Sequence, residues 1–290
     1  MKLGFIGFGE VGYEISRGLK TEGLQGIVAY DIVQDEPKLG QLVRERAVKT
    51  EVTLLDTPGA VVNAADVIIA AVPGSEAVKA AESAIASLCK GKIYVDVSTS
   101  SPTAKQKIAA LVEPTGALFA DAGMMGALPL KQHKVPTLLS GSGASQYIEM
   151  MSPYHMSLEK VSDKAGDAIA IKLVRSVYMK GVMALSVEML EAATKLGVEN
   201  LVLDSLSNTL DGLSFLETIN YLVPSCAIHA GRQSHEMSDC MVMLNDIGVK
   251  PTMTESTMLR LQWLADKKLK ETFQGKVPAT WEEVVQAWGE

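Results

Sequence analysis

A glycine-rich turn near the N-terminus has the residue types and spacing of a phosphate-binding loop. The apolar run Lys2–Ile6 leads into Gly7, Gly9 and Gly12, which form the pattern G-x-G-x-x-G. The first glycine permits a tight turn, the second lets a pyrophosphate approach the backbone, and the third lets the next helix pack on the strand. Helix-start N–H groups then face the phosphates. The candidate cofactor-binding residues of this turn are Gly7, Phe8, Gly9, Glu10, Val11 and Gly12.

An acidic residue follows at the distance expected for a dinucleotide site. Ile27–Tyr30 has the composition of the next strand, and Asp31 stands at its end. A carboxylate there accepts hydrogen bonds from the ribose hydroxyls and repels a 2′-phosphate. No arginine occurs among residues 32–35. The pattern therefore predicts NAD and disfavours NADP, and the alternative is an unliganded glycine turn with a solvated aspartate.

Two later turns follow apolar strands, and ligands of open parallel sheets bind at the carboxyl ends of the strands. The first apolar strand, Asp66–Val72, is closed by Pro73-Gly74. We therefore expect Val72 and Pro73 to line the cofactor site.

The second turn follows the apolar strand Lys92–Val97 and carries several hydroxyls. Ser98 lies closest to the strand end, so we assign it a contact with nicotinamide or substrate. Ser100 and Ser101 directly precede Pro102, and a serine before a proline often starts a helix. Helix capping is the competing interpretation for these two serines.

The elements that position these residues alternate between strand and helix through the first half of the chain. Further strands are expected at Ala117–Asp121 and Thr137–Ser140, and helices at Glu76–Leu88 and Pro102–Val112. Such alternation predicts an α/β domain with a parallel sheet covered by helices on both faces.

After about Asp163 the strand signals end. A helical pattern without proline runs from Gly166 to about Leu196, which is roughly 45 Å at 1.5 Å per residue. Further helices are expected at Val198–Leu210, Gly212–Leu222, Ser225–Ile247, Thr252–Leu269 and Thr280–Ala287. We therefore predict a Rossmann-type domain at residues 1–163 and an all-helical domain at residues 164–290, joined by one long helix.

Composition narrows the possible partners. The 290-residue chain carries a net charge of −7 with scattered basic residues, whereas a nucleic-acid surface needs a basic patch. No apolar run reaches the roughly twenty residues of a membrane span, so neither nucleic acid nor a membrane is an expected partner. The cysteines Cys89, Cys226 and Cys240 show no metal or disulfide spacing, which favours a reducing cytoplasm and no metal.

Taken in order, the motifs resemble the β-hydroxyacid dehydrogenase superfamily, which includes 3-hydroxyisobutyrate and 6-phosphogluconate dehydrogenases. The resemblance rests on five features in order: the N-terminal glycine turn, a strand ending in Val-Pro, D-x-S-T-x-S-P from Asp96, D-A-G-x-x-G-A from Asp121, and a glycine followed six residues later by a lysine on a long helix. The resemblance covers most of residues 2–196 and implies an oxidoreductase that uses a nicotinamide cofactor on a small hydroxyacid.

The resemblance implies that Lys172 on the long helix is the general acid/base. Its neighbours are apolar, and partial burial makes an ammonium group a better proton donor and acceptor near neutral pH. The alternative is a lysine that extends to water from an apolar helix. The family usually carries Asn four residues later, where this chain has Ser176, a shorter substrate-binding candidate on the same helical face.

Two departures from the family pattern concern the substrate. The family loop D-A-P-V-S-G-G holds a carboxylate, but this chain has Met124 and Met125 followed by Gly126 and Ala127. We expect Met125, Gly126 and Ala127 to form a more apolar substrate site, partly through backbone amides. Inward packing of both methionines is the alternative.

The second departure lies in the helical domain, where His235 replaces a lysine of the family. His229, Arg232 and Glu236 share one helical face by their spacing, and Arg232 could bind a carboxylate bidentately. We include Arg232 and His235 among the substrate-binding candidates. An exposed helix with an Arg232–Glu236 ion pair is the competing interpretation. The methionine loop and the helix with Arg232 and His235 resemble a divergent subgroup of the superfamily.

The sequence thus predicts an NAD-dependent dehydrogenase that interconverts a hydroxyl and a carbonyl on a small hydroxyacid-like substrate. The apolar helical domain predicts a homodimer or a higher homo-oligomer. A reductase of C=N bonds on the same scaffold is one alternative, although its relatives generally lack the lysine at position 172. A non-catalytic NAD-binding module is the other.

Overall fold

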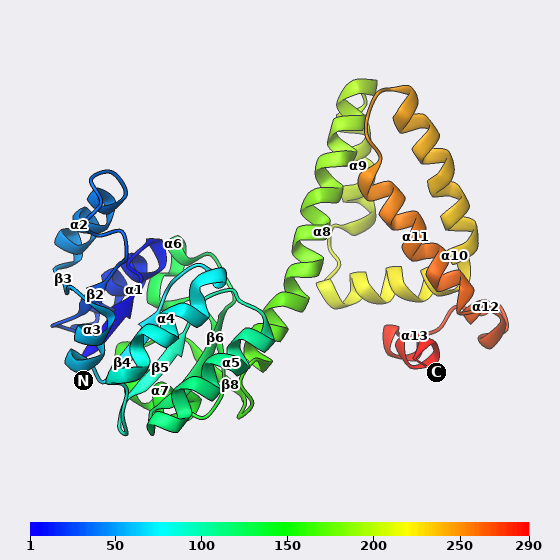
Figure 1. Cartoon of the computed structure of the whole chain (residues 1–290). Coiled ribbons are helices and arrows are strands. Elements are labelled where there is room, and N and C mark those ends of the chain that lie inside the picture. The colour runs from blue at the N-terminus through cyan, green and yellow to red at the C-terminus, as the bar shows by residue number, and fades with distance from the viewer. Residues whose placement is uncertain (290) are drawn as a thin grey trace. The chain divides into compact units, whose positions relative to one another are not determined.

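The computed structural model describes residues 1–289, which form two compact units, Met1–Ser176 and a second from Val177 onward. The first unit contains an eight-stranded sheet of order β3-β2-β1-β4-β5-β6-β7-β8 (Figure 1). The strands are β1 Leu3–Ile6, β2 Val28–Tyr30, β3 Thr53–Leu54, β4 Val67–Ala70, β5 Ile93–Asp96, β6 Leu118–Met124, β7 Thr137–Ser140 and β8 Leu158–Ser162. This arrangement confirms the α/β, Rossmann-type prediction.

One strand pair departs from the expected parallel sheet. β6 and β7 are antiparallel, with Asp121 opposite Ser140, whereas all other neighbouring pairs are parallel. The segment between these strands contains only the short helix α6 Leu128–Lys131 and a 3₁₀ turn. A parallel neighbour needs a longer crossover of a dozen or more residues, usually a full helix. The chain therefore returns beside β6 in the opposite direction.

Each face of the sheet is covered by helices, and side chains alternate between two apolar cores. Leu3 and Phe5 of β1 belong to the core that includes Ile15 and Leu19, while Ile6 belongs to the opposite core. The helices of the first unit are α1 Glu10–Thr21, α2 Leu39–Thr50, α3 Pro58–Ala64, α4 Ala77–Ala84, α5 Pro102–Val112 and α7 Ala144–Met151. The first core packs on α1, α2 and α7, and the second on α3, α4 and α5. Strands covered on both faces explain the continuous apolar runs in the sequence.

The helix starts follow local capping rules. Thr57 accepts a hydrogen bond from the Ala60 amide at the start of α3, and Ser101 does the same for Ala104 at the start of α5. A proline occupies the first helical position in both cases, where its missing N–H costs nothing. The capping interpretation is therefore correct for Ser101.

The long helix expected from Gly166 is confirmed as α8 Asp167–Leu196, whose first ten residues belong to the first unit. The second unit is entirely helical over its described residues. Its further helices are α9 Glu199–Leu210, α10 Phe215–Asp246, α11 Thr252–Asp266, α12 Leu269–Thr272 and α13 Trp281–Trp288.

The expectation of separate helices at Gly212–Leu222 and Ser225–Ile247 is wrong, because α10 runs through Pro224 without a break. Ser214 and Glu217 form a capping box at its start, with the Glu217 amide donating to Ser214 Oγ at 3.3 Å. Pro224 is buried, and Ala227 packs with α11 and α13 in a small apolar core. Packing on both sides of the proline offsets the backbone hydrogen bond that proline removes.

Candidate functional site

The glycine turn joins β1 to α1 and has little room for side chains. Gly7 has a φ of +87°, and a Cβ built on it would lie 2.6 Å from the Ala71 carbonyl oxygen. Its amide donates to the Tyr30 carbonyl at 2.8 Å, so the turn is held between β1, β2 and the end of β4. A Cβ on Gly9, in contrast, would meet nothing within 4 Å. The backbone at Gly9 therefore faces open space in front of the N-terminus of α1.

Asp31 ties the end of β2 to this turn. Its Oδ2 accepts the Phe8 amide at 2.7 Å and its Oδ1 accepts the Val33 amide at 3.0 Å. The side chain of Phe8 is buried in the core, so only its backbone belongs to the site. The carboxylate is thereby fixed at the carboxyl end of β2.

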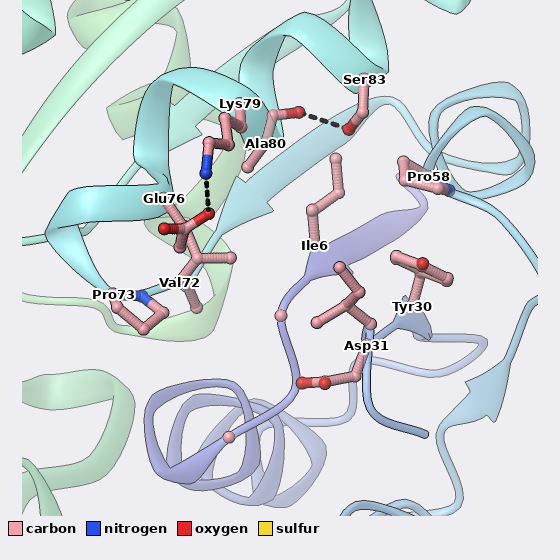
Figure 2. Close-up of a pocket in the computed structure, with 14 residues that line it drawn as sticks. Ile6, Tyr30, Asp31, Pro58, Val72, Pro73, Glu76, Lys79, Ala80 and Ser83 are labelled. Atoms are coloured by element: carbon pink, nitrogen blue, oxygen red, sulfur yellow. Dashed lines mark hydrogen bonds and ion pairs between the residues drawn. The ribbon is translucent and has the colours of Figure 1, made fainter. Parts of the chain in front are cut away.

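A cavity of about 390 Å³ opens beside the turn and Asp31. Figure 2 shows Tyr30 and Asp31 on one side, and Val72 and Pro73 at the turn after β4 on the other. Most of the lining side chains are apolar. These include Ile6, Tyr30, Ile32, Pro58, Val72, Pro73 and Ala80. Two carboxylates also line the cavity: Glu76 pairs with Lys79 at 3.1 Å, and Asp31 lies beside the glycine turn. Apolar walls, the Asp31 carboxylate and an open glycine turn fit the adenosine and pyrophosphate parts of a dinucleotide.

A second groove, of about 340 Å³, continues past Val72 and Pro73 along the ends of β5 and β6. Its other lining residues are Glu10, Val11, Ala71, Gly74, Val97, Ser98, Thr99 and Met124. Because both hollows share Ala71, Val72 and Pro73, they adjoin at the end of β4. The fold thus brings the predicted site residues to one edge of the sheet. They are the residues of the glycine turn together with Asp31, Val72, Pro73 and Ser98.

Thr99, which the sequence analysis did not single out, contacts the proposed acid/base. Lys172 Nζ lies 3.0 Å from Thr99 Oγ1 and donates a hydrogen bond to it. Ser98 is buried instead, with its hydroxyl donating to Asp96 Oδ2 at 3.1 Å. The signal for Thr99 was present in the D-x-S-T motif, but chain position alone did not say which hydroxyl turns toward the helix.

The helix that carries Lys172 packs closely on β6. A Cβ built on Gly123 would lie 2.9 Å from the Ala168 carbonyl oxygen and 3.6 Å from the Lys172 Cβ. Only a glycine leaves room for this approach. Lys172 is half-buried where it emerges beside β6, so the geometry agrees with the partial burial expected of it.

The methionine loop is only partly free to bind a ligand. The Met125 amide donates to the Pro136 carbonyl at 2.7 Å, which extends the pairing of β6 with β7. Met124 packs on the core of the first unit and lines the second groove. Gly126 and Ala127 follow and are exposed. The backbone amides expected to hold a carboxylate are therefore reduced to those of Gly126 and Ala127.

Arg232 and His235 belong to the helical unit, on α10, and both are exposed. Arg232 Nη1 pairs with Glu236 Oε2 at 2.9 Å, which is the ion pair of the competing interpretation. Arg232 and His229 also line a cavity of about 360 Å³ between α10 and the α11–α12 connection. Ser176 lies on α8 at the end of the first unit.

Fold and site together define a dinucleotide-binding protein of the Rossmann class. Residues 2–163 match the family described as the NAD binding domain of 6-phosphogluconate dehydrogenase, and the chain belongs to that family. Residues 193–264 match a domain of unknown function, DUF1932. The resemblance to the β-hydroxyacid dehydrogenase superfamily is thereby confirmed, within a subgroup that has its own C-terminal domain.

Three relatives illustrate the range of similarity. A conserved protein of unknown function, described as structurally similar to 3-hydroxyacid dehydrogenases, is 31% identical with a TM-score of 0.61 and covers 95% of this chain and 100% of its own. Human mitochondrial 3-hydroxyisobutyrate dehydrogenase is 25% identical over 72% of this chain, and the match spans 62% of that enzyme. The imine reductase of Streptomyces aurantiacus, at 14% identity, shares the fold with a TM-score of 0.74 over 99% of both chains.

Proposed function

We propose that this chain is an NAD-dependent oxidoreductase that interconverts a hydroxyl and a carbonyl on a small hydroxyacid-like substrate. The observation that carries the proposal is the 3.0 Å hydrogen bond from Lys172 Nζ to Thr99 Oγ1, beside a groove that adjoins the dinucleotide cavity. This arrangement holds an amine at the carboxyl ends of β5 and β6, where ligands of such sheets bind.

The chain's residues divide the work in this proposal. A bound nicotinamide supplies the hydride chemistry. Gly9 and the start of α1 hold the pyrophosphate, and Asp31 holds the adenosine ribose. Lys172 Nζ takes the proton of the substrate hydroxyl during oxidation and returns it during reduction. During reduction the same ammonium stabilises charge that develops on the carbonyl oxygen. Thr99 orients the amine.

Substrate binding is assigned first to residues of the unit that carries Lys172. Ser98 contributes through its place in the second groove, and the amides of Gly126 and Ala127 are candidates for a carboxylate. Met124 gives the groove an apolar wall, which favours a substrate with an apolar substituent. Ser176, Arg232 and His235 remain further candidates for the substrate.

NAD is the proposed cofactor because Asp31 stands where a 2′-phosphate would meet a carboxylate. Solved structures of similar fold include the imine reductase of Myxococcus stipitatus in complex with NADP⁺ and its V8 variant in complex with NAD⁺. Within residues 1–289, no group of three or more histidine, cysteine or acidic side chains could hold a metal ion. The three cysteines are free, and this supports the proposed reducing, cytoplasmic setting.

We also propose that the chain forms a homodimer. Large apolar side chains are exposed along α8, including Val174, Val177 and Val187, each more than half exposed. Exposed apolar surface on this scale marks an interface, and a second copy of the chain offers a matching apolar helix. Light scattering after gel filtration should give twice the chain mass. The same measurement on a double variant, Val177→Glu with Val187→Glu, should give the mass of one chain.

None of the described helices is both long enough and apolar enough to span a membrane.

The test is NAD reduction against a panel of small hydroxyacids, with cyclic imines and NADH in a parallel panel. Lys172→Ala should lower kcat by about a hundredfold or more without changing the NADH dissociation constant. The matched control is Lys164→Ala, which removes an exposed lysine just before α8. Equal turnover by the wild type and Lys172→Ala contradicts the acid/base role. Turnover of imines alone favours the C=N reductase.

A further inference from the structure

A fully buried ionic cluster lies beneath the proposed site. Lys105 of α5 and the aspartates Asp96 of β5 and Asp121 of β6 have no exposed side-chain surface. Lys105 Nζ is 3.0 Å from Asp96 Oδ2 and 3.2 Å from Asp121 Oδ1, and it donates to the Asp96 carbonyl at 2.8 Å. The contact with Asp121 is an ion pair without hydrogen-bond alignment. Buried charges are costly and persist where they are paired.

The two aspartates need a cation between them. Asp96 and Asp121 are direct partners in the parallel pairing of β5 with β6, so their side chains leave the same face of the sheet about 4.8 Å apart. Like charges at that separation repel strongly in a dry interior. Among the described residues, Lys105 is the only fully buried lysine or arginine, and it contacts both carboxylates.

One carboxylate shapes the loop that presents Thr99. Asp96 Oδ1 accepts the Ser98 amide at 2.9 Å and Oδ2 accepts the Ser98 hydroxyl at 3.1 Å. The Ser98 hydroxyl also lies 3.3 Å from Ser100 Oγ. These contacts fold the residues after β5 back over Asp96, and Thr99 is left exposed at the tip.

The other carboxylate anchors the start of α8. Asp121 Oδ2 accepts the Ile169 amide at 3.0 Å and the Ser140 hydroxyl at 3.2 Å. Ser140 Oγ in turn accepts the Ala168 amide at 3.1 Å. A carboxylate at a helix N-terminus is favourable because it meets unpaired N–H groups and the positive end of the helix dipole. Lys172 follows Ile169 by about one turn on the same helix.

We propose that Lys105 is a positioning residue that fixes the Thr99 loop and the start of α8 relative to each other. Its ammonium contacts both Asp96, which holds the loop of Thr99, and Asp121, which holds the start of the helix of Lys172. The 3.0 Å contact between the Thr99 and Lys172 side chains therefore depends on Lys105. The effect of Lys105 on turnover rests on the proposed function, whereas its effect on the order of the Thr99 loop and the start of α8 does not.

The test replaces Lys105 by Met, which keeps the length of the side chain and removes its charge. Lys107→Met is the matched control, because Lys107 lies on the same helix with an exposed side chain. Amide hydrogen exchange is followed by mass spectrometry for residues 97–101 and 167–173, with β1 and β4 as internal references. The rate at which an amine-acylating reagent labels Lys172 is measured at one pH. Neither readout needs cofactor or substrate.

With Lys105→Met, exchange in both segments should rise about tenfold or more while β1 and β4 change little. Labelling of Lys172 should become about threefold or more faster, because Thr99 no longer holds the amine. Lys107→Met should match the wild type. If turnover is detected, kcat should fall about tenfold with the KM for NADH unchanged. Absence of turnover in the wild type would count against the proposed function alone, because the exchange and labelling results stand without it.

Two results would overturn the proposal. One is unchanged exchange and labelling in Lys105→Met. The other is exchange that rises equally across the first unit, which indicates a general contribution to stability. If Lys105→Met does not fold, the double variant Lys105→Met, Asp121→Asn removes the repulsion and keeps an oxygen for the Ile169 amide, and the same readouts apply. Failure of both variants to fold would show that Lys105 supports the whole sheet, and the local positioning role would be wrong.

Discussion

Substitution of Gly9 by alanine should separate cofactor binding from folding. A Cβ at this position meets nothing within 4 Å, and the φ of −74° lies outside the left-handed region that favours glycine, but the ψ of −149° lies outside the usual extended range. The free energy of unfolding should therefore change by no more than about 1 kcal/mol. The new methyl group occupies the open space in front of the first amides of α1. A pyrophosphate needs that space to reach the backbone.

The expected loss of affinity follows from crowding and from lost phosphate hydrogen bonds. Crowding by one methyl group in a packed contact costs about 1–3 kcal/mol, and each weakened charge-assisted hydrogen bond adds about 1.5 kcal/mol or more. A total near 3 kcal/mol raises the dissociation constant of NADH about a hundredfold. Titration of NADH fluorescence measures the constant, and thermal melts measure stability.

The other glycines of the turn supply contrasting controls. Gly7→Ala places a Cβ 2.6 Å from the Ala71 carbonyl oxygen at a φ of +87°, and such strain costs about 1–3 kcal/mol before the clash is counted. That variant should lose stability as well as affinity. Outside the turn, Gly231→Ala on α10, where a Cβ would lie 3.8 Å from the Ala265 Cβ, should gain up to about 1 kcal/mol and bind NADH normally. If Gly9→Ala binds NADH as the wild type does, the glycine turn is not the pyrophosphate site.

Three further substitutions test separate contacts. Asp31→Asn removes the carboxylate charge at the end of β2, so the preference for NADH over NADPH should fall about tenfold or more; an unchanged ratio of the two dissociation constants would contradict the assignment of NAD. Burial lowers the pKa of His133, opposed by Glu22, whose Oε1 lies 3.6 Å from its Nε2. Because the pKa of His133 is lower in the folded chain, the unfolded chain binds the proton at a higher pH. The free energy of unfolding should therefore fall as pH drops below about 6.5, and thermal melts of His133→Gln should show a smaller fall. Burial disfavours the charge of Glu188, but the Thr254 hydroxyl and the amides of Met253 and Thr254, at 2.6 to 2.8 Å, outweigh burial and lower its pKa. Glu188→Gln should lower the free energy of unfolding by about 1–3 kcal/mol near neutral pH. A carboxylate of lowered pKa stabilises the fold above about pH 4.3, so the difference between variant and wild type should vanish as pH falls through the lowered pKa. Equal melting temperatures at all pH values would show that the carboxylate contributes nothing.

Much of the fold could be predicted because its signals are local. The apolar runs of β1, β4 and β5, the prolines at the starts of α3 and α5, and the long uninterrupted pattern of α8 each specify an element from nearby residues. Pro224 misled the prediction, because its effect on α10 is decided by packing against helices far along the chain. The reversal of β7 was also missed, since strand direction depends on the connection and not on the strand's own composition.

The site shows the same limit. The glycine turn and Asp31 lie within the first βαβ unit, so their spacing was enough to place them together. Which hydroxyl of the D-x-S-T motif meets Lys172 depends on Asp96 pulling Ser98 inward, and no local pattern reports that contact. Lys105 had no sequence signal at all, because a lysine on a predicted helix is normally solvated.

The geometry changes the interpretation of the D-A-G-x-x-G-A segment. As a motif it resembles one substrate-binding loop, but its members do different things in this chain. Asp121 accepts the Ile169 amide in the first turn of α8, Gly123 lets that helix approach β6, and the Met125 amide completes the pairing with β7. Only Gly126 and Ala127 extend beyond these contacts. Because the first part of the segment positions the helix that carries Lys172, replacement of the family serine by Met125 can alter the substrate without disturbing the amine. We therefore expect the acid/base chemistry of the family to be retained here and its substrate to differ.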